Sequence, residues 1–159
     1  MDQKALFLKI WSQEAPTTRK VLSRIPEGSN YRPDPKSRTA REIAWQIVRE
    51  EIVLGEGLER GVFEWAELPA PATMKEVVDT YDLHHDKVTK TFHATEPARW
   101  EQSVPFMMGG QELMKATGYD NAWGFLLDMI HHRGQLTTYL RPMGSTVPQI
   151  YGPSADEPM

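Results

Sequence analysis

The sequence of 159 residues contains no cysteine. Disulfide bonds, thiolate metal sites and a cysteine nucleophile are therefore excluded, because each of them needs a thiol. Long apolar runs are also missing: the N-terminal stretch MDQKALFLKIW lacks the apolar core of a signal peptide, and no other run approaches the length of a membrane span. These absences predict a soluble, cytoplasmic protein that has no membrane partner.

Clusters of positive charge are missing as well. The chain has 18 Lys and Arg against 22 Asp and Glu, for a net charge of −4, and no run of Lys or Arg exceeds two residues. Surfaces that bind nucleic acid are built from dense Lys and Arg patches, so we expect no nucleic-acid partner. No phosphate-binding loop or dinucleotide fingerprint is present, and the pair Gly109-Gly110 is too short a signal to indicate one.

The chain does contain four segments in which apolar residues recur every three to four positions, which is typical of amphipathic helices. Two of them begin with the spacing of a capping box, Thr39 to Glu42 and Thr73 to Glu76. Strand signals are scarce, and the least periodic part, residues 94–120, has at most a short helix near residues 111–117. The sequence therefore predicts an all-α four-helix bundle, with long proline-containing connections. We expect a single domain over residues 1–159 whose tail, residues 145–159, is not helical.

The last of these helices combines a core stripe with polar residues. His132 falls on the same stripe as Met129 and Leu136, where an apolar residue would be expected, and Asp128 precedes it by one turn. Residues four apart lie on the same face of a helix, so the side chains of Asp128 and His132 can converge on one point. In the helix predicted for residues 40–60, Gln46 and Glu50 form a similar pair beside the apolar stripe.

The C-terminal run IHHRGQLTTYLRPMG, followed by VPQIYGPSADE, resembles the signature of the DinB/YfiT-like superfamily, a group of bacterial four-helix proteins often described as metalloenzymes. The order of elements, with REIAWQIVREE in the second helix, is similar too. The resemblance implies a divalent metal held by three side chains, typically histidines, one from the second helix and two from the last. The corresponding residues here are Gln46, Asp128 and His132, only one of which is a histidine.

The resemblance also implies a function. Zinc, nickel, iron or manganese would suit these nitrogen and oxygen donors, and the protein would be a metal-dependent enzyme that acts on a small molecule, as a thiol S-transferase or a hydrolase. A low-molecular-weight thiol is the expected partner, Glu50 or His131 would move protons as the catalytic groups, and the protein would form a homodimer. No organic cofactor is expected.

Two alternatives use the same residues without catalysis. Asp128 could accept a hydrogen bond from Gln46 or His132 in a buried polar cluster that holds no metal. The protein would then be a stress-associated, small-molecule-binding protein, or a dimeric structural protein, with a degenerate metal site. The other histidines, at positions 84, 85 and 93, are expected to be mostly exposed and to ligate nothing.

Overall fold

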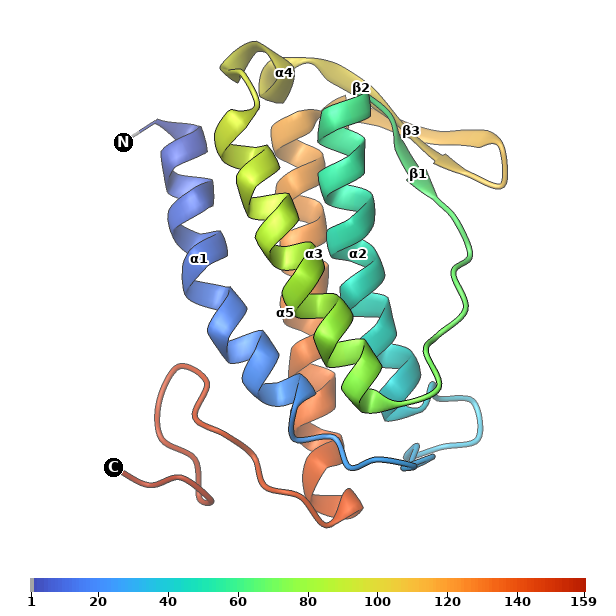
Figure 1. The fold of residues 1–159 in the computed structure, drawn as a ribbon, viewed down its shortest axis with the longest axis vertical. Coiled ribbons are helices and arrows are strands. Elements are labelled where there is room, and N and C mark those ends of the chain that lie inside the picture. The colour runs from blue at the N-terminus through green and yellow to red at the C-terminus, as the bar shows by residue number, and fades with distance from the viewer. Residues whose placement is uncertain (1) are drawn as a thin grey trace.

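The computed structural model describes residues 2–159. Four long helices lie side by side (Figure 1): α1 (Gln3–Leu22), α2 (Ala40–Arg60), α3 (Met74–Ala94) and α5 (Gly118–Leu140). Helix α2 packs against both α3 and α5, and α1 packs against α3 and α5 from the other side. Side chains are buried on nearly every face of α2 in its middle turns, so this helix is the central element of the molecule.

Local sequence signals determine where these helices begin. Thr39 and Thr73 both form complete capping boxes, in which the Thr side chain accepts a backbone hydrogen bond and the Glu three residues later bonds back to the Thr backbone. The predicted bounds of α2 are therefore confirmed. Helix α5 begins at Gly118, where Thr117 caps it by accepting from the backbone of Asp120.

The prediction of an all-α four-helix bundle is wrong, because the fold also contains a three-stranded mixed sheet and a short helix, α4 (Pro97–Glu101). Strand β1 (Phe63–Trp65) pairs in parallel with β2 (Ser103–Met108), and β2 pairs antiparallel with β3 (Gln111–Thr117). The segment predicted as a short helix, residues 111–117, is thus a strand.

The turn of this hairpin explains the error. Gly109 and Gly110 both have positive φ, at 57° and 78°, and they form the two-residue link between β2 and β3. A Gly-Gly pair between two short apolar segments is a hairpin signal. The signal was masked by Pro105 within β2 and by a register shift after Phe106, which together remove the regular alternation expected of a strand.

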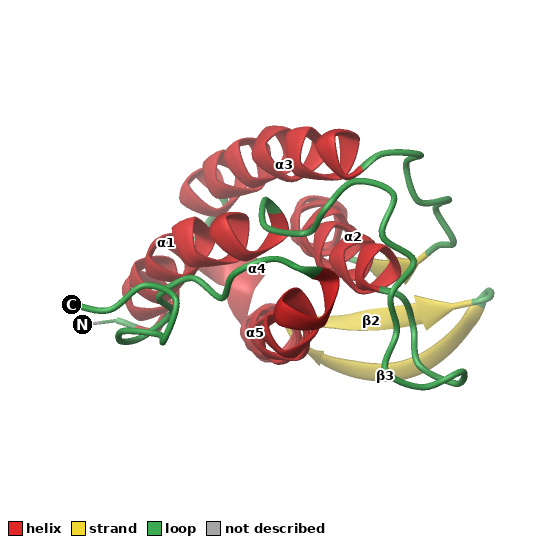
Figure 2. Cartoon of the chain, turned by 90° about the horizontal axis from the view of Figure 1, so that it is seen from below, coloured by secondary structure: helices red, strands yellow, loops and turns green. Residues whose placement is uncertain are grey.

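The sheet lies beside α2 and α5, on the side away from α1 (Figure 2). The connection from β1 to α3 runs down beside α2, and the non-helical tail after the 3-10 turn Arg141–Met143 forms loops beyond the lower end of α1 (Figure 1). Across residues 2–159, no helix is both long enough and apolar enough to cross a lipid bilayer.

Close packing of β1 on α2 depends on a glycine. A Cβ atom added to Gly57 would lie 2.1 Å from Cδ1 of Phe63, a ring that is fully buried. Helix α2 and the start of β1 can therefore approach only because position 57 has no side chain. This contact places the sheet against the helix that carries Gln46 and Glu50.

We expect Gly57→Ala to destabilise the protein by about 2–3 kcal/mol, because the added methyl group overpacks a buried contact. Gly124→Ala is the matched control: this helical glycine has open space around its Cβ position, so alanine should stabilise by about 0.5–1 kcal/mol through helix propensity. Urea unfolding of both variants measures the difference. Equal effects of the two substitutions would contradict the packing argument.

Candidate metal centre

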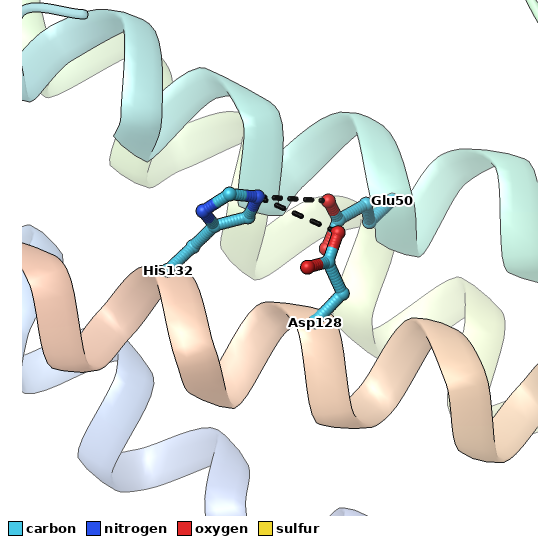
Figure 3. Close-up of side chains that lie close together, drawn as sticks. All are labelled: Glu50, Asp128 and His132. Atoms are coloured by element: carbon cyan, nitrogen blue, oxygen red, sulfur yellow. Dashed lines mark ion pairs between the residues drawn. The ribbon is translucent and has the colours of Figure 1, made fainter. Parts of the chain in front are cut away.

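Three ligand-type side chains converge between α2 and α5 (Figure 3). Glu50 projects from α2, and Asp128 and His132 project from successive turns of α5. The Nε2 atom of His132 lies 3.4 Å from Oδ2 of Asp128 and 3.6 Å from Oε1 of Glu50. One ligand atom from each of the three residues lies within 4.8 Å of the other two.

Burial differs sharply within this group. The side chain of Glu50 is 1% exposed and that of His132 is 8% exposed, whereas that of Asp128 is 52% exposed. Burial raises the pKa of the Glu50 carboxyl to about 9, and the nearby negative charge of Asp128 adds to this effect. Near neutral pH, Glu50 is therefore a neutral acid unless a cation compensates its charge.

Neighbouring polar groups hold one of the two Glu50 oxygens. Nε2 of Gln46 donates to Oε1 of Glu50 at 2.7 Å, and Oε1 of Gln46 accepts from the Arg38 guanidinium at 3.2 Å. These contacts oppose the rise in the pKa of Glu50 without overcoming the burial. The second oxygen, Oε2, is buried and has no hydrogen-bond partner among residues 2–159.

The opposite nitrogen of His132 contacts Gln135. Nδ1 of His132 lies 3.1 Å from Oε1 of Gln135, so in the tautomer that donates from Nδ1 the Nε2 lone pair faces the two carboxyl groups. Such a bond to the second ring nitrogen is the usual way in which a ligating histidine is oriented. Nε2 of Gln135 in turn lies 3.0 Å from Nε2 of His131, whose side chain is exposed.

The donor set and its spacing fit a divalent transition metal. Donor atoms at zinc-like distances in a tetrahedral arrangement are roughly 3.3–3.6 Å apart, which agrees with the distances from His132 Nε2 to Asp128 and Glu50. The unpartnered oxygen of Glu50 is a further sign, because a buried carboxyl oxygen without a partner is uncommon. Three side chains leave other coordination positions open.

A cavity of about 740 Å³ opens beside the carboxyl groups of Glu50 and Asp128. Residues of α2 and α5, of strands β1 and β2 and of the loop after β1 line it, so the sheet missing from the sequence-based prediction forms part of its wall. This volume is in the range of pockets that bind small molecules. The group is therefore accessible to a ligand from one side.

The sequence-based assignments to this site have different outcomes. The structure brings Asp128 and His132 together as expected from their spacing, and Glu50 also lies at ligand distance, whereas Gln46 contacts Glu50. The metal roles of Gln46, Asp128 and His132 stay predictions. His131 is one hydrogen bond away from Gln135 rather than beside the carboxyl groups. The catalytic roles of Glu50 and His131 stay predictions.

Sequence reasoning also missed a second buried pair. His85 is not mostly exposed as expected: its side chain is 21% exposed, and Nδ1 lies 3.1 Å from the buried carboxylate of Glu51. Its ring stacks between those of Trp11 and Tyr81. The one available signal was that Glu51 falls in an apolar stretch of α2, where a carboxylate needs a partner from another helix.

The DinB family model matches residues 123–159, which include α5 from Trp123 and the tail. The chain is 28% identical over 158 residues to the uncharacterized protein YrdA of Bacillus subtilis (strain 168), covering 95% of this chain and 89% of that protein.

Solved structures of DinB-like proteins are similar in fold. One from Bacillus cereus ATCC 10987 has a TM-score of 0.73 at 22% identity, covering 91% of this chain and 95% of that one. One from Bacillus subtilis has a TM-score of 0.70 at 16% identity, covering 97% and 99%. The family model matches the helix that carries two of the three candidate ligands, and the fold of these DinB-like proteins agrees with that of this chain over the remaining length.

Proposed function

We propose that Glu50, Asp128 and His132 bind a divalent transition-metal ion and that the protein is a metal-dependent enzyme acting on a small molecule in the adjoining cavity. The observation that carries this proposal is the convergence of one imidazole nitrogen and two carboxyl groups at distances that suit a metal. The reaction class that fits the superfamily resemblance is thiol transfer or hydrolysis.

We assign the third ligand to Glu50 rather than to Gln46 for two reasons. A carboxylate is a stronger donor to a divalent cation than a neutral amide. Both ends of the Gln46 amide already have partners, since its nitrogen donates to Glu50 and its oxygen accepts from Arg38. Gln46 would then position the ligand without touching the ion.

The chemistry follows from the open side of the group. A divalent ion with a free coordination position would lower the pKa of water or a thiol, and so supply a nucleophile near neutral pH. Half-exposed Asp128 borders the cavity, whereas Glu50 and His132 are shielded from water. Since Glu50 would hold the ion, we assign proton exchange with solvent to His131, at the exposed end of the hydrogen-bonded series His132–Gln135–His131.

Substituting His132 tests the metal. The wild-type protein, purified without a metal column, should take up about one equivalent of Zn²⁺ or Mn²⁺ per chain. His132→Ala should bind at least about tenfold more weakly, because it loses the only nitrogen donor of the group. Isothermal titration calorimetry and elemental analysis measure both quantities.

The matched control is His93→Ala, which removes an exposed histidine from the far end of α3 and should leave metal affinity unchanged. Two results would contradict the proposal: no uptake by the wild-type protein, or equal uptake by the His132→Ala variant. The first result would instead favour the non-catalytic binding protein.

The burial of Glu50 predicts how stability depends on pH when metal is absent. The folded pKa, about 9, is above the ordinary value of 4.5. The folded protein therefore keeps a proton that the unfolded chain releases, and stability falls as pH rises between these values, by at most about 1.4 kcal/mol per pH unit. Glu50→Gln removes this titration, so the variant should gain at least about 1 kcal/mol relative to wild type between about pH 5 and about pH 8.

Urea unfolding with a chelator present at the two pH values measures this difference. Glu51 is also buried, and burial raises its pKa, so the informative quantity is the change in slope between wild type and Glu50→Gln, not the slope itself. Identical slopes for the two proteins would show that Glu50 is ionised in the folded state, against the burial argument.

A further inference from the structure

The cavity beside the candidate metal centre is lined by acidic, aromatic and basic side chains. Glu50, Asp128 and Arg38 line it, and so do the side chains of Trp45 and Trp65. Gln46 connects Arg38 to Glu50 through hydrogen bonds to both. A ligand of moderate size would therefore contact the metal centre, an aromatic surface and a positive charge at the same time. These three features limit the class of molecule that the cavity can accept.

The acidic residues that line the cavity differ in how their charges are compensated. Among the acidic residues that line it, Glu42 accepts hydrogen bonds from the backbone and hydroxyl of Thr39, and Glu67 forms an ion pair with Arg49 at 3.3 Å. Thr39 is neutral, so Glu42 keeps its negative charge, whereas that of Glu67 is paired. The other two, at positions 50 and 128, belong to the candidate metal centre, where a divalent cation would balance their charges; without the ion, the charge of half-exposed Asp128 is screened by water.

Arg38 is the positive charge that remains. One of its terminal nitrogens donates to Gln46, and no ion pair to Arg38 is formed within residues 2–159. A guanidinium group has five N–H donors in a planar fork that matches a carboxylate or phosphate. The free donors of Arg38, which lines the cavity, are therefore suited to an anionic group.

Arg49 is a second arginine in the cavity wall. Its side chain is 9% exposed, its terminal nitrogens contact Glu67 and the backbone oxygen of Ala66, and its Nε is buried without a partner among residues 2–159. Because Nε is shielded from solvent, a molecule in the cavity does not reach it in this conformation, and the anion site depends on Arg38.

The aromatic surface is held rigidly. The Arg49 guanidinium lies 4.2 Å from the ring centre of Trp65, and the indole nitrogen of Trp45 donates to the backbone oxygen of Leu68 at 2.8 Å. Both indoles are thus fixed before any ligand arrives. Preformed apolar walls with a few placed polar groups are typical of small-molecule sites.

We infer that this cavity binds a small organic anion, with its carboxylate or phosphate group at Arg38, its apolar body against Trp45 and Trp65, and its reacting end at the Glu50–Asp128–His132 group. The inference rests on the proposed function for the reacting end only. The anion site depends on Arg38 and does not require the metal.

The test compares two probes of the same shape, phenylacetate and phenylacetamide, in protein treated with a chelator. Quenching of tryptophan fluorescence measures the binding of each. The anion should bind at least about tenfold more tightly than the neutral amide. Arg38→Met, which keeps the length of the side chain but removes its charge, should weaken phenylacetate about tenfold and leave phenylacetamide unchanged.

Arg60→Met is the matched control, because Arg60 is an exposed arginine on α2 that pairs with Glu56 and does not line the cavity. It should bind both probes as wild type does. Arg38→Lys retains a positive charge and should keep most of the preference for the anion, which separates a lost charge from a disturbed loop.

Three results would overturn the inference: equal binding of the two probes by wild type, no saturable response to either probe up to about 10 mM, or an equal loss in the Arg38→Met and Arg60→Met variants. Because these measurements are made without metal, they are independent of the metal titration. A protein that binds no metal but prefers the anion through Arg38 would disprove the proposed function and leave this inference standing.

Discussion

The burial of carboxyl groups on α2 is the constraint on which the centre of this protein depends. Glu50 and Glu51 are consecutive, and both side chains are almost fully buried. Consecutive residues of a helix project about 100° apart, so the two carboxyl groups face different neighbours: Glu50 faces α5, and Glu51 faces His85 of α3. An ionised carboxylate in the interior is costly unless it is paired, so each of these two helix contacts needs its own cation or proton.

Helix α5 also has two consecutive buried side chains that face different neighbours, His132 and Arg133. His132 faces Glu50, whereas the adjacent Arg133 faces α1, where it pairs with Glu14 at 2.7 Å. The side chain of Arg133 is only 2% exposed to solvent. The hydroxyl of Tyr151, in the tail, accepts from Arg133 at 2.6 Å. The tail is thereby held by a buried charge one residue away from the candidate metal ligand His132.

Features that depend on residues close together in the sequence could be predicted, whereas features that depend on contacts between distant segments could not. The capping boxes at Thr39 and Thr73 and the pair Asp128–His132 are local, and the structure contains all three. The choice between Gln46 and Glu50 could not be made locally. The two residues are one turn apart on the same face of α2, so only the register of α2 against α5 decides which of them reaches His132. The sheet was not predicted because it also depends on a contact between distant segments. Strands β1 and β2 are far apart in the sequence, and no local sequence pattern predicts their parallel pairing.

The ligand types of the proposed metal site determine how much of an ion's charge the protein balances. Three neutral imidazoles would leave a divalent ion with its full charge, whereas Glu50 and Asp128 together would neutralise it, and carboxylate donors favour harder ions such as manganese over softer ones. Gln46 contacts Arg38 with one end of its amide and Glu50 with the other. In the proposed site it would therefore connect the guanidinium that recognises a ligand to a carboxyl group that holds the ion, and a primary amide suits this position because it has both an acceptor oxygen and donor hydrogens.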